Sequence, residues 1–408
     1  MKYLIPFLCL IPIIVNGQFI NPKPEWKIKT NGKIIGSASY SDGTIYLGSN
    51  SGTLYALNAQ NGTVKWKFNA TGKWISRPLI QGNMLYQLNG NGVFYAINKD
   101  DGAVKWTFKT GGEHPMKRMS GNKSYDDLWD YYLSGASYDN NTIYFGSSDG
   151  NIYALDSNQG ILKWKFKTEG EIHATPVIKD SVVFAGSMDG NIYALKSTNG
   201  SLLWKFNTIG ARYFPKGAIQ RSPIFHQGTL LFGSRDFNLY AIDIKTGHGL
   251  WNYKDPGGWI IATPSVYNGH VYVGTSDSHR FYSFSAKNGT LNWETSLNMR
   301  VYGSAVFDHS RVYFGCFNGF LYGLNVQDGT IEWKFQTDGS IRNYHTVYDK
   351  GGNFKKGFKL YGSTLTETKN SEAKIQSLGS ILATPLKHNG ILYFGSTDSM
   401  FYAVMLPD

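Results

Sequence analysis

Side chains able to carry out acid–base or metal chemistry are few and widely spaced in this sequence. Glu171 and His173 lie two residues apart, a spacing that puts two side chains on the same face of a β-strand. No nucleophile motif stands beside them, so the pair does not predict a catalytic group. His114, His173 and His345 could converge through the loops as metal ligands, but nothing in their spacing requires it. We therefore predict no catalytic residues and no metal ligands.

Any site must be positioned by a repeated strand pattern. Residues 147–170 read SSDGNIYALDSNQGILKWKFKTEG, which alternates apolar and polar residues between two tight turns. The same pattern returns at residues 187–210 as SMDGNIYALKSTNGSLLWKFNTIG. Alternation with period two is typical of half-buried β-strands, and glycine in the turns supplies the positive φ that tight hairpins need. The chain is thus a series of copies of one all-β unit.

Eight tryptophans mark the outer strand of each copy. They are Trp26, Trp66, Trp106, Trp164, Trp204, Trp251, Trp293 and Trp333, and most neighbours are about forty residues apart. Four strands in a period near forty residues indicate a β-propeller blade. The wide aromatic side chain suits the wedge between neighbouring blades, so we interpret these tryptophans as packing residues.

The first and last copies are both incomplete. The eighth strand pair, from Ile391, has no tryptophan strand after it, and the tryptophan strand around Trp26 has no strand pair before it. Joining the two would close a ring and hide its exposed sheet edges. The sequence predicts an all-β, eight-bladed propeller of four-stranded blades, with the N-terminal strand completing the last blade.

The N-terminus is typical of a secretory signal peptide. Lys2 precedes an apolar run that ends near Val15, and this run is too short for a comfortable membrane span. We assign residues 1–17 to the signal peptide and 18–408 to the propeller. Cys9 would leave with the signal peptide and lacks a lipidation box, so the mature chain keeps only Cys316. We expect an exported protein, periplasmic or extracellular, that is not a transmembrane protein.

The formal net charge is +11. Lysines are scattered over the outward face of the repeats and form no run of like charge, so we predict no nucleic-acid partner.

The repeat resembles a known family. ALDSNQGILKW, residues 154–164, and AIDIKTGHGLW, residues 241–251, are similar to the tryptophan-docking repeat of the pyrroloquinoline quinone (PQQ) type β-propellers. The resemblance covers essentially the whole mature chain and implies the propeller fold. One branch of this family comprises dehydrogenases of alcohols and sugars that hold PQQ and calcium on the axis. Another comprises non-catalytic scaffolds, including the propeller subunit of the outer-membrane β-barrel assembly machine, which is similar in length and blade number.

The sequence departs from the dehydrogenase branch at its cysteines. The resemblance implies an adjacent Cys-Cys pair stacked on the quinone, whereas this chain contains only Cys9 and Cys316. We expect no cofactor, and PQQ with calcium only under the alternative of a dehydrogenase that lacks the pair.

Three insertions fall in the same kind of connection, from an outer strand to the next inner strand. They are residues 113–132, 211–217 and 342–379. In a propeller all such connections emerge on one face, so we expect this face to carry the function.

Candidate binding residues interrupt the repeat where inner strands begin, at positions that hold Gly, Ser, Ala or Thr in most blades. They are Trp74, Arg77, His173, Gln220, Arg221, Trp259, Arg300, Tyr302 and Arg342. Four arginines converging on the axis would form an electropositive funnel suited to an anion or an acidic peptide. Alternatively, each arginine pairs with a local acidic residue. We predict an exported, non-catalytic scaffold that binds a protein, a peptide or an anionic polysaccharide on the insertion-bearing face; the alternative is the PQQ-dependent dehydrogenase.

Overall fold

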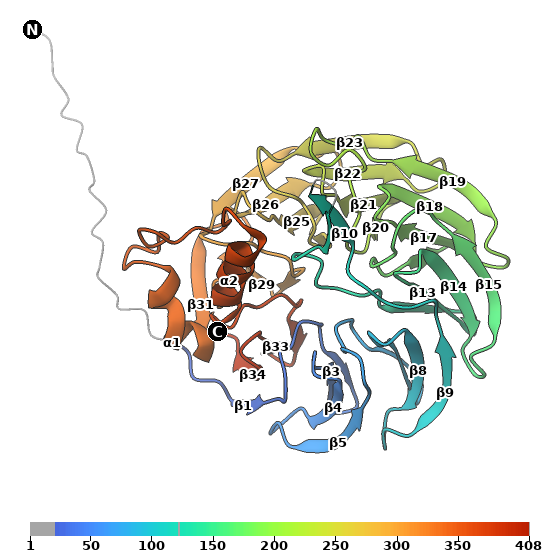
Figure 1. Cartoon of the computed structure of the whole chain (residues 1–408), viewed down its shortest axis with the longest axis horizontal. Coiled ribbons are helices and arrows are strands. Elements are labelled where there is room, and N and C mark those ends of the chain that lie inside the picture. The colour runs from blue at the N-terminus through green and yellow to red at the C-terminus, as the bar shows by residue number, and fades with distance from the viewer. Residues whose placement is uncertain (1–20, 121–122, 408) are drawn as a thin grey trace, which may run out of the picture.

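Eight four-stranded antiparallel sheets are arranged radially around a central axis (Figure 1). The computed structural model describes residues 21–120 and 123–407. The predicted signal peptide, residues 1–17, lies outside the described residues. The predicted eight-bladed, nearly all-β propeller is confirmed.

The first four blades follow the repeats in order. Blade 1 holds β2 (Ser39–Ser41), β3 (Thr44–Gly48), β4 (Thr53–Asn58) and β5 (Val64–Asn69). Blade 2 holds β6 (Leu79–Gln81), β7 (Met84–Leu88), β8 (Val93–Asn98) and β9 (Val104–Lys109). Blade 3 holds β12 (Ala136–Asp139), β13 (Thr142–Gly146), β14 (Asn151–Asp156) and β15 (Leu162–Lys167). Blade 4 holds β16 (Val177–Lys179), β17 (Val182–Gly186), β18 (Asn191–Lys196) and β19 (Leu202–Asn207).

The remaining four blades complete the ring. Blade 5 holds β20 (Ile224–His226), β21 (Thr229–Gly233), β22 (Asn238–Asp243) and β23 (Gly249–Lys254). Blade 6 holds β24 (Ser265–Tyr267), β25 (His270–Gly274), β26 (Arg280–Ser285) and β27 (Leu291–Ser296). Blade 7 holds β28 (Val306–Phe307), β29 (Arg311–Gly315), β30 (Phe320–Asn325) and β31 (Ile331–Gln336). Blade 8 holds β32 (Leu386–His388), β33 (Ile391–Gly395), β34 (Met400–Met405) and β1 (Trp26–Lys29).

The N-terminal strand closes the ring as predicted. Strand β1 pairs antiparallel with β34, with Trp26 opposite Ala403. The indole N–H of Trp26 donates to the carbonyl oxygen of Ala59, in blade 1, at 3.0 Å. Blade 8 is therefore joined to blade 1 by a strand and a side chain that both come from the N-terminal segment.

The repeated tryptophans dock each blade onto the next. The indole N–H of Trp164, in blade 3, donates to the carbonyl of Ser197, in blade 4, at 2.8 Å. Its ring lies against Gly200, whose φ is +71°, and a Cβ added there would lie 2.6 Å from the ring. The glycine is needed both for the turn and for the close approach of the neighbouring tryptophan. This packing supports the interpretation of the tryptophans as structural residues.

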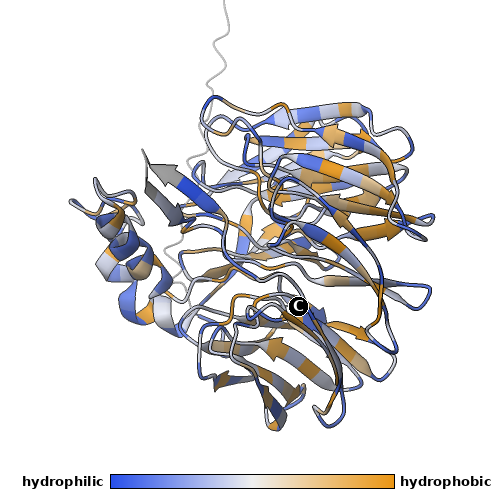
Figure 2. Cartoon of the chain, turned by 45° about the vertical axis from the view of Figure 1, so that its right-hand side comes forward, coloured by the Kyte–Doolittle hydropathy of each residue, from blue (hydrophilic) through white to orange (hydrophobic). Residues whose placement is uncertain are grey.

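Two insertions contain structure outside the repeat. The first forms the hairpin of β10 (Lys117–Ser120) and β11 (Lys123–Asp126). Another contains α1 (Asp338–Val347) and α2 (Leu365–Gln376). In Figure 2 the hairpin and the helices project from the same side of the disc. None of the helices in residues 21–120 and 123–407 is long and apolar enough to cross a membrane.

Helix α1 starts before the sequence-predicted insertion boundary. The Thr337 side chain accepts a hydrogen bond from the backbone N–H of Ser340, which makes Thr337 the N-cap. Asp338 in the first turn favours this end through the helix dipole. Arg342 therefore lies on a helix and does not begin an inner strand; the segment that leads into β32 of blade 8 follows α2 instead.

Candidate functional site

The segment that carries β10 and β11 runs across the middle of the ring (Figure 1). Trp129 packs edge-on against Trp259, from the entrance to blade 6, with ring centroids 6.2 Å apart. The hydroxyl of Tyr132 donates to the carbonyl of Leu382, in blade 8, at 2.9 Å. Tyr131 donates to the carboxylate of Glu372, on α2, at 3.2 Å. These contacts join the insertion to both sides of the ring, and we call its described residues, 113–120 and 123–132, the plug.

A buried chain of hydrogen bonds anchors the plug to blades 3 to 5. Ser148 Oγ lies 2.8 Å from His173 Nε2, and His173 Nδ1 lies 2.9 Å from Asp130 Oδ1. Ser148 Oγ also donates to Glu113 Oε2 at 2.9 Å. Gln220 donates its amide N–H to Asp130 Oδ1 at 3.1 Å. Glu113 and Asp130 belong to the plug, whereas the other three residues belong to the propeller.

Although Ser148, His173 and Asp130 are arranged like a catalytic triad, their protons are already committed. A serine nucleophile would have to donate its hydroxyl proton to the histidine. Here Ser148 Oγ also lies 2.9 Å from Glu113 Oε2, and the raised pKa of His173 favours an imidazolium whose Nε2–H donates to Ser148 Oγ. With Nδ1 donating to Asp130, the imidazole is doubly protonated. The arrangement is a buried ion pair that holds the plug and contains no activated nucleophile.

The electrostatics of His173 agree with this assignment. Burial alone lowers the pKa of His173, but the carboxylates of Asp130, Glu113 and Glu171 outweigh burial and raise it above its ordinary value of 6.5. Burial raises the pKa of Asp130, yet the charges of His173 and Arg235 bring it below its ordinary value. Both shifts favour the charged forms of the pair.

Arg235 is a second anchor that the sequence reasoning missed. It forms a buried ion pair with Asp127 of the plug and donates from Nη2 to Gln220 Oε1 at 2.8 Å. Its guanidinium carbon lies 4.6 Å from the ring centroid of Trp259. Arg235 occupies the turn position that holds Ser148 in blade 3 and Met188 in blade 4. An arginine at this turn position interrupts the repeat, and this interruption is the sequence signal that marks Arg235.

Arg300 is buried and fully paired at the same face. Its Nη1 donates to Glu372 Oε1 at 2.6 Å, and its Nε donates to Asp277 at 3.2 Å. Glu372 also accepts from the indole N–H of Trp129 at 2.9 Å. Glu372 thus joins α2, the plug and blade 7 in one cluster, in which no guanidinium N–H of Arg300 faces solvent.

The other candidates have different surroundings. Trp74 is fully buried and donates to the carbonyl of Gly52 at 2.9 Å, so it packs between blades 1 and 2. Tyr302 is fully buried, with its ring 4.6 Å from that of Phe317. Arg342 is 60% exposed on α1, with Asp398 at 3.8 Å.

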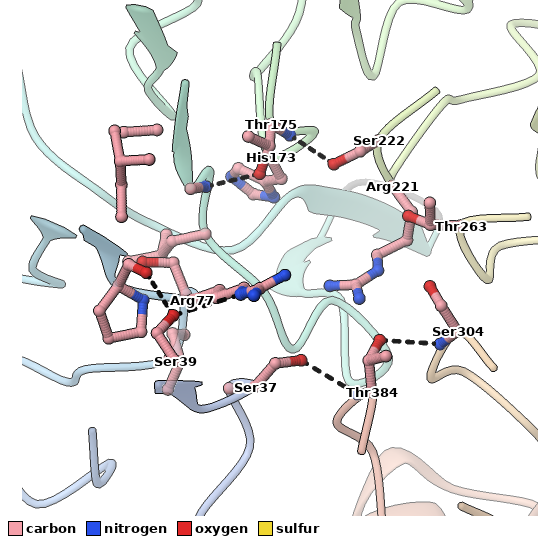
Figure 3. Close-up of a pocket in the computed structure, with 18 of the residues that line it drawn as sticks. Ser37, Ser39, Arg77, His173, Thr175, Arg221, Ser222, Thr263, Ser304 and Thr384 are labelled. Carbon is pink, nitrogen blue, oxygen red and sulfur yellow. Dashed lines mark hydrogen bonds between the residues drawn. The ribbon is translucent and has the colours of Figure 1, made fainter. Parts of the chain in front are cut away.

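Arg77 and Arg221 share a separate cavity of about 580 Å³ on the axis (Figure 3). Each inner segment runs from the insertion-bearing face towards the opposite face. The plug contacts the first residues of these segments, and the cavity is lined by later ones such as Ser37, Thr175 and Thr384. The cavity therefore lies beyond the plug, towards the opposite face. The four arginines expected to form one funnel are divided: two line this cavity, one is buried at the plug and one lies on α1.

Comparison with known proteins identifies the family. The profile of the family described as outer membrane protein assembly factor BamB matches residues 23–127, 126–257 and 216–350, well over half of the chain. The chain belongs to the BamB family. No functionally curated protein matches it significantly.

Solved structures share the BamB-type fold. BamB from Moraxella catarrhalis is 17% identical over 94% of this chain and 100% of its own, with a TM-score of 0.68. Sqt1 from Saccharomyces cerevisiae is 11% identical over 95% of this chain and 100% of its own, with a TM-score of 0.68. Quinohemoprotein alcohol dehydrogenase ADHIIG from Pseudomonas putida HK5 is 12% identical over 94% of this chain and 76% of its own, with a TM-score of 0.65. At these identities the likeness shows the fold alone.

The axial cavity of this BamB-family chain lacks side chains suited to the calcium that accompanies PQQ in the dehydrogenase branch. Calcium takes carboxylate and other oxygen ligands, and no carboxylate or amide side chain lines the axial cavity. Among the described residues, no group of three or more His, Cys, Asp or Glu side chains is arranged to hold a metal ion. Cys316 is fully buried and its thiol donates to the carbonyl of Met299. The other end of the axis is filled by the plug.

Proposed function

We propose that this protein is a non-catalytic scaffold that binds a protein partner on the insertion-bearing face. Following the description of the family to which it belongs, we propose that it is exported to the periplasm and takes part in outer membrane protein assembly. The observation that carries the proposal is the exposure of large apolar side chains in or directly beside the insertions. Ile209 is 70% exposed, Tyr213 is 76% exposed and Ile341 is 56% exposed.

These side chains have the properties of a protein-docking surface. Interfaces are enriched in tyrosine and other large apolar residues, and isoleucine and tyrosine on a projecting insertion gain contact area when a partner covers them. Tyr361, which is also exposed, lies next to a basic segment that includes Lys355, Lys356 and Lys359. The surface therefore suits a partner with an apolar segment flanked by acidic residues.

The charged groups at this face support a protein partner over an anionic polysaccharide. Arg300 and Arg235 are buried in ion pairs with Glu372 and Asp127. Neither guanidinium is free to bind sulfate or carboxylate groups of a glycan, because each already donates to a carboxylate of the insertions.

Site-specific photo-crosslinking tests the proposal. A photo-reactive residue at Tyr213 or Ile341 should crosslink to the same partner protein in the native host. The matched control is Ile161, which is 59% exposed at the start of an outer strand, on the opposite face. Crosslinking at the control position alone, or equal crosslinking at all three, would contradict the assignment of the docking face.

The dehydrogenase alternative has a direct biochemical test. We expect no saturable binding of PQQ with calcium by absorbance and calorimetry, and no dye-linked oxidation of alcohols or sugars. Tight binding together with such oxidation would overturn the scaffold proposal.

A further inference from the structure

Equivalent residues of all eight blades line the axial cavity. At one equivalent position, just before the paired inner strand, most blades place a serine or threonine. The set is Ser37, Arg77, Gly135, Thr175, Ser222, Thr263, Ser304 and Thr384, and all eight line the cavity (Figure 3). The ring of small hydroxyl residues is interrupted by glycine in blade 3 and by arginine in blade 2.

Several of these hydroxyl oxygens accept a hydrogen bond from a backbone N–H of a neighbouring blade. The backbone N–H of Thr175 donates to Ser222 Oγ at 3.0 Å, and that of Gly135 donates to Thr175 Oγ1 at 2.9 Å. On the other side of the ring, the N–H of Thr384 donates to Ser37 Oγ at 3.0 Å. A hydroxyl that accepts one hydrogen bond keeps its own O–H for donation. The ring therefore presents hydroxyl donors whose geometry the backbone has already set.

Two arginines enter this ring without a carboxylate partner. Arg77 donates from Nε to Ser39 Oγ at 3.2 Å, and Arg221 lies with its guanidinium carbon 3.9 Å from the ring centroid of Tyr132. Nε of Arg221 is buried and has no hydrogen-bond acceptor. In the described part of the chain, neither guanidinium lies within 4.0 Å of a carboxylate oxygen. Figure 3 shows both groups pointing into the cavity from different sides.

The cavity wall offers hydrogen-bond donors and no negative charge. His173 reaches the wall, but both of its ring nitrogens are bonded to Ser148 and Asp130 behind it. Burial lowers the pKa of Arg77 and of Arg221, which is the sign of cations held without a nearby anion. Arg77 is exposed to the open cavity and Arg221 is half-buried, and two like charges that face one space disfavour each other until an anion joins them.

We propose that the axial cavity binds a small dianion carrying carboxylate or phosphate groups, with Arg77 and Arg221 as the charged ligands and the hydroxyl ring as additional donors. Guanidinium groups bind such oxyanions through parallel N–H donors. The cavity volume lies in the range of small-molecule sites. This site is independent of the proposed docking face, because the plug separates them.

The repeat itself supplies conservative variants for the test. Arg77→Thr installs the residue that blades 4, 6 and 8 have at this position, and Arg221→Ala installs the residue that the same blades have at the neighbouring position. Because sibling blades fold with these residues, both variants should fold. Arg342→Ala removes an exposed arginine on α1, outside the cavity, and is the matched control.

Thermal unfolding and calorimetry of the full chain measure the effect. Succinate and inorganic phosphate are the two charged probes, and succinamide is the neutral probe, all at constant ionic strength with chloride. We expect at least one charged probe to raise the Tm of the wild type and of Arg342→Ala, with no shift from succinamide. A response to succinate alone identifies a dicarboxylate site, and a response to phosphate alone identifies a phosphate site.

The two arginine variants test whether the probe binds in the axial cavity. Loss of either guanidinium should weaken binding of the active probe by roughly ten- to a hundredfold, as expected for a charge-assisted hydrogen bond. Without any probe, the variants should be at least as stable as the wild type, since an unpaired cation has been removed. The proposal is wrong if neither charged probe shifts the Tm, or if the shift survives in Arg77→Thr and Arg221→Ala. Such a result would leave the proposal for the docking face unaffected.

Discussion

Replacing Glu372 with alanine should loosen helix α2 and the plug together. The carboxylate accepts from Arg300 at 2.6 Å and from Trp129 at 2.9 Å, and all of these groups are buried or half-buried. Breaking a buried ion pair by removing one partner costs about 3–5 kcal/mol. Arg300 keeps a second carboxylate, Asp277, at 3.2 Å, so we expect a cost near the lower bound, about 3 kcal/mol.

This cost should appear as local opening, because the blades retain their own core. A local loss of about 3 kcal/mol corresponds to roughly a hundredfold faster hydrogen exchange in the affected amides. Native-state hydrogen exchange should show this increase over residues 365–376 and also in the plug. The matched control is Glu367→Ala, which removes the capping box of the same helix at Thr364. It should cost about 1 kcal/mol and leave exchange in the plug unchanged.

A double variant separates the ion pair from simple loss of packing. Combining Glu372→Ala with Arg300→Met removes both charges, so the plug should regain much of its protection. If the two effects simply add, or if Glu372→Ala leaves the plug unaffected, Glu372 does not join α2 to the plug and this reasoning is refuted.

Three further predictions follow from other parts of the fold. The folded-state pKa of His173 lies above its ordinary value of 6.5, so its contribution to stability is present below pH 6.5 and is lost as pH rises through the folded pKa. The free energy of unfolding, measured from pH 6 to 9, should therefore fall less steeply for His173→Gln than for the wild type. An equal slope would exclude the ion pair with Asp130 as the cause of the pH dependence. Gly233→Ala should destabilise blade 5 by about 1–3 kcal/mol in denaturant unfolding, because the added Cβ would lie 2.0 Å from the carbonyl oxygen of Ile260. An unchanged unfolding midpoint would mean that the backbone moves aside at little cost in free energy. Burial raises the pKa of Cys316 to about 12, so thiol reagents should label it only on unfolding; rapid labelling of the native protein would show that the thiol is accessible.

The ring of blades could be predicted because the sequence of each copy of the repeat can be compared with the other seven. Eight tryptophans at a nearly constant spacing fixed the number of blades, and the two incomplete ends implied the pairing of β1 with β34. Arg77 and Arg221 were recognised for the same reason, since each stands where sibling blades have a small residue.

Contacts within the insertions could not be predicted in this way. Glu372 and Asp127 have no counterparts in other blades, so nothing in the sequence indicated that they neutralise Arg300 and Arg235. The division of the axis into a plugged end and a cavity depends on how two insertions, more than 200 residues apart in the sequence, pack together.

The closure of blade 8 also constrains how the molecule is made. While β1 and β34 are apart, seven sectors are complete, and the last one presents the bare polar edge of β34. An unpaired edge is a template for any extended chain. In the folded chain, pairing with the N-terminal segment covers this edge of the C-terminal strand. Because this closing strand is a terminal segment, we expect that at high concentration the segment of one copy can complete the ring of another, which would give exchanged dimers.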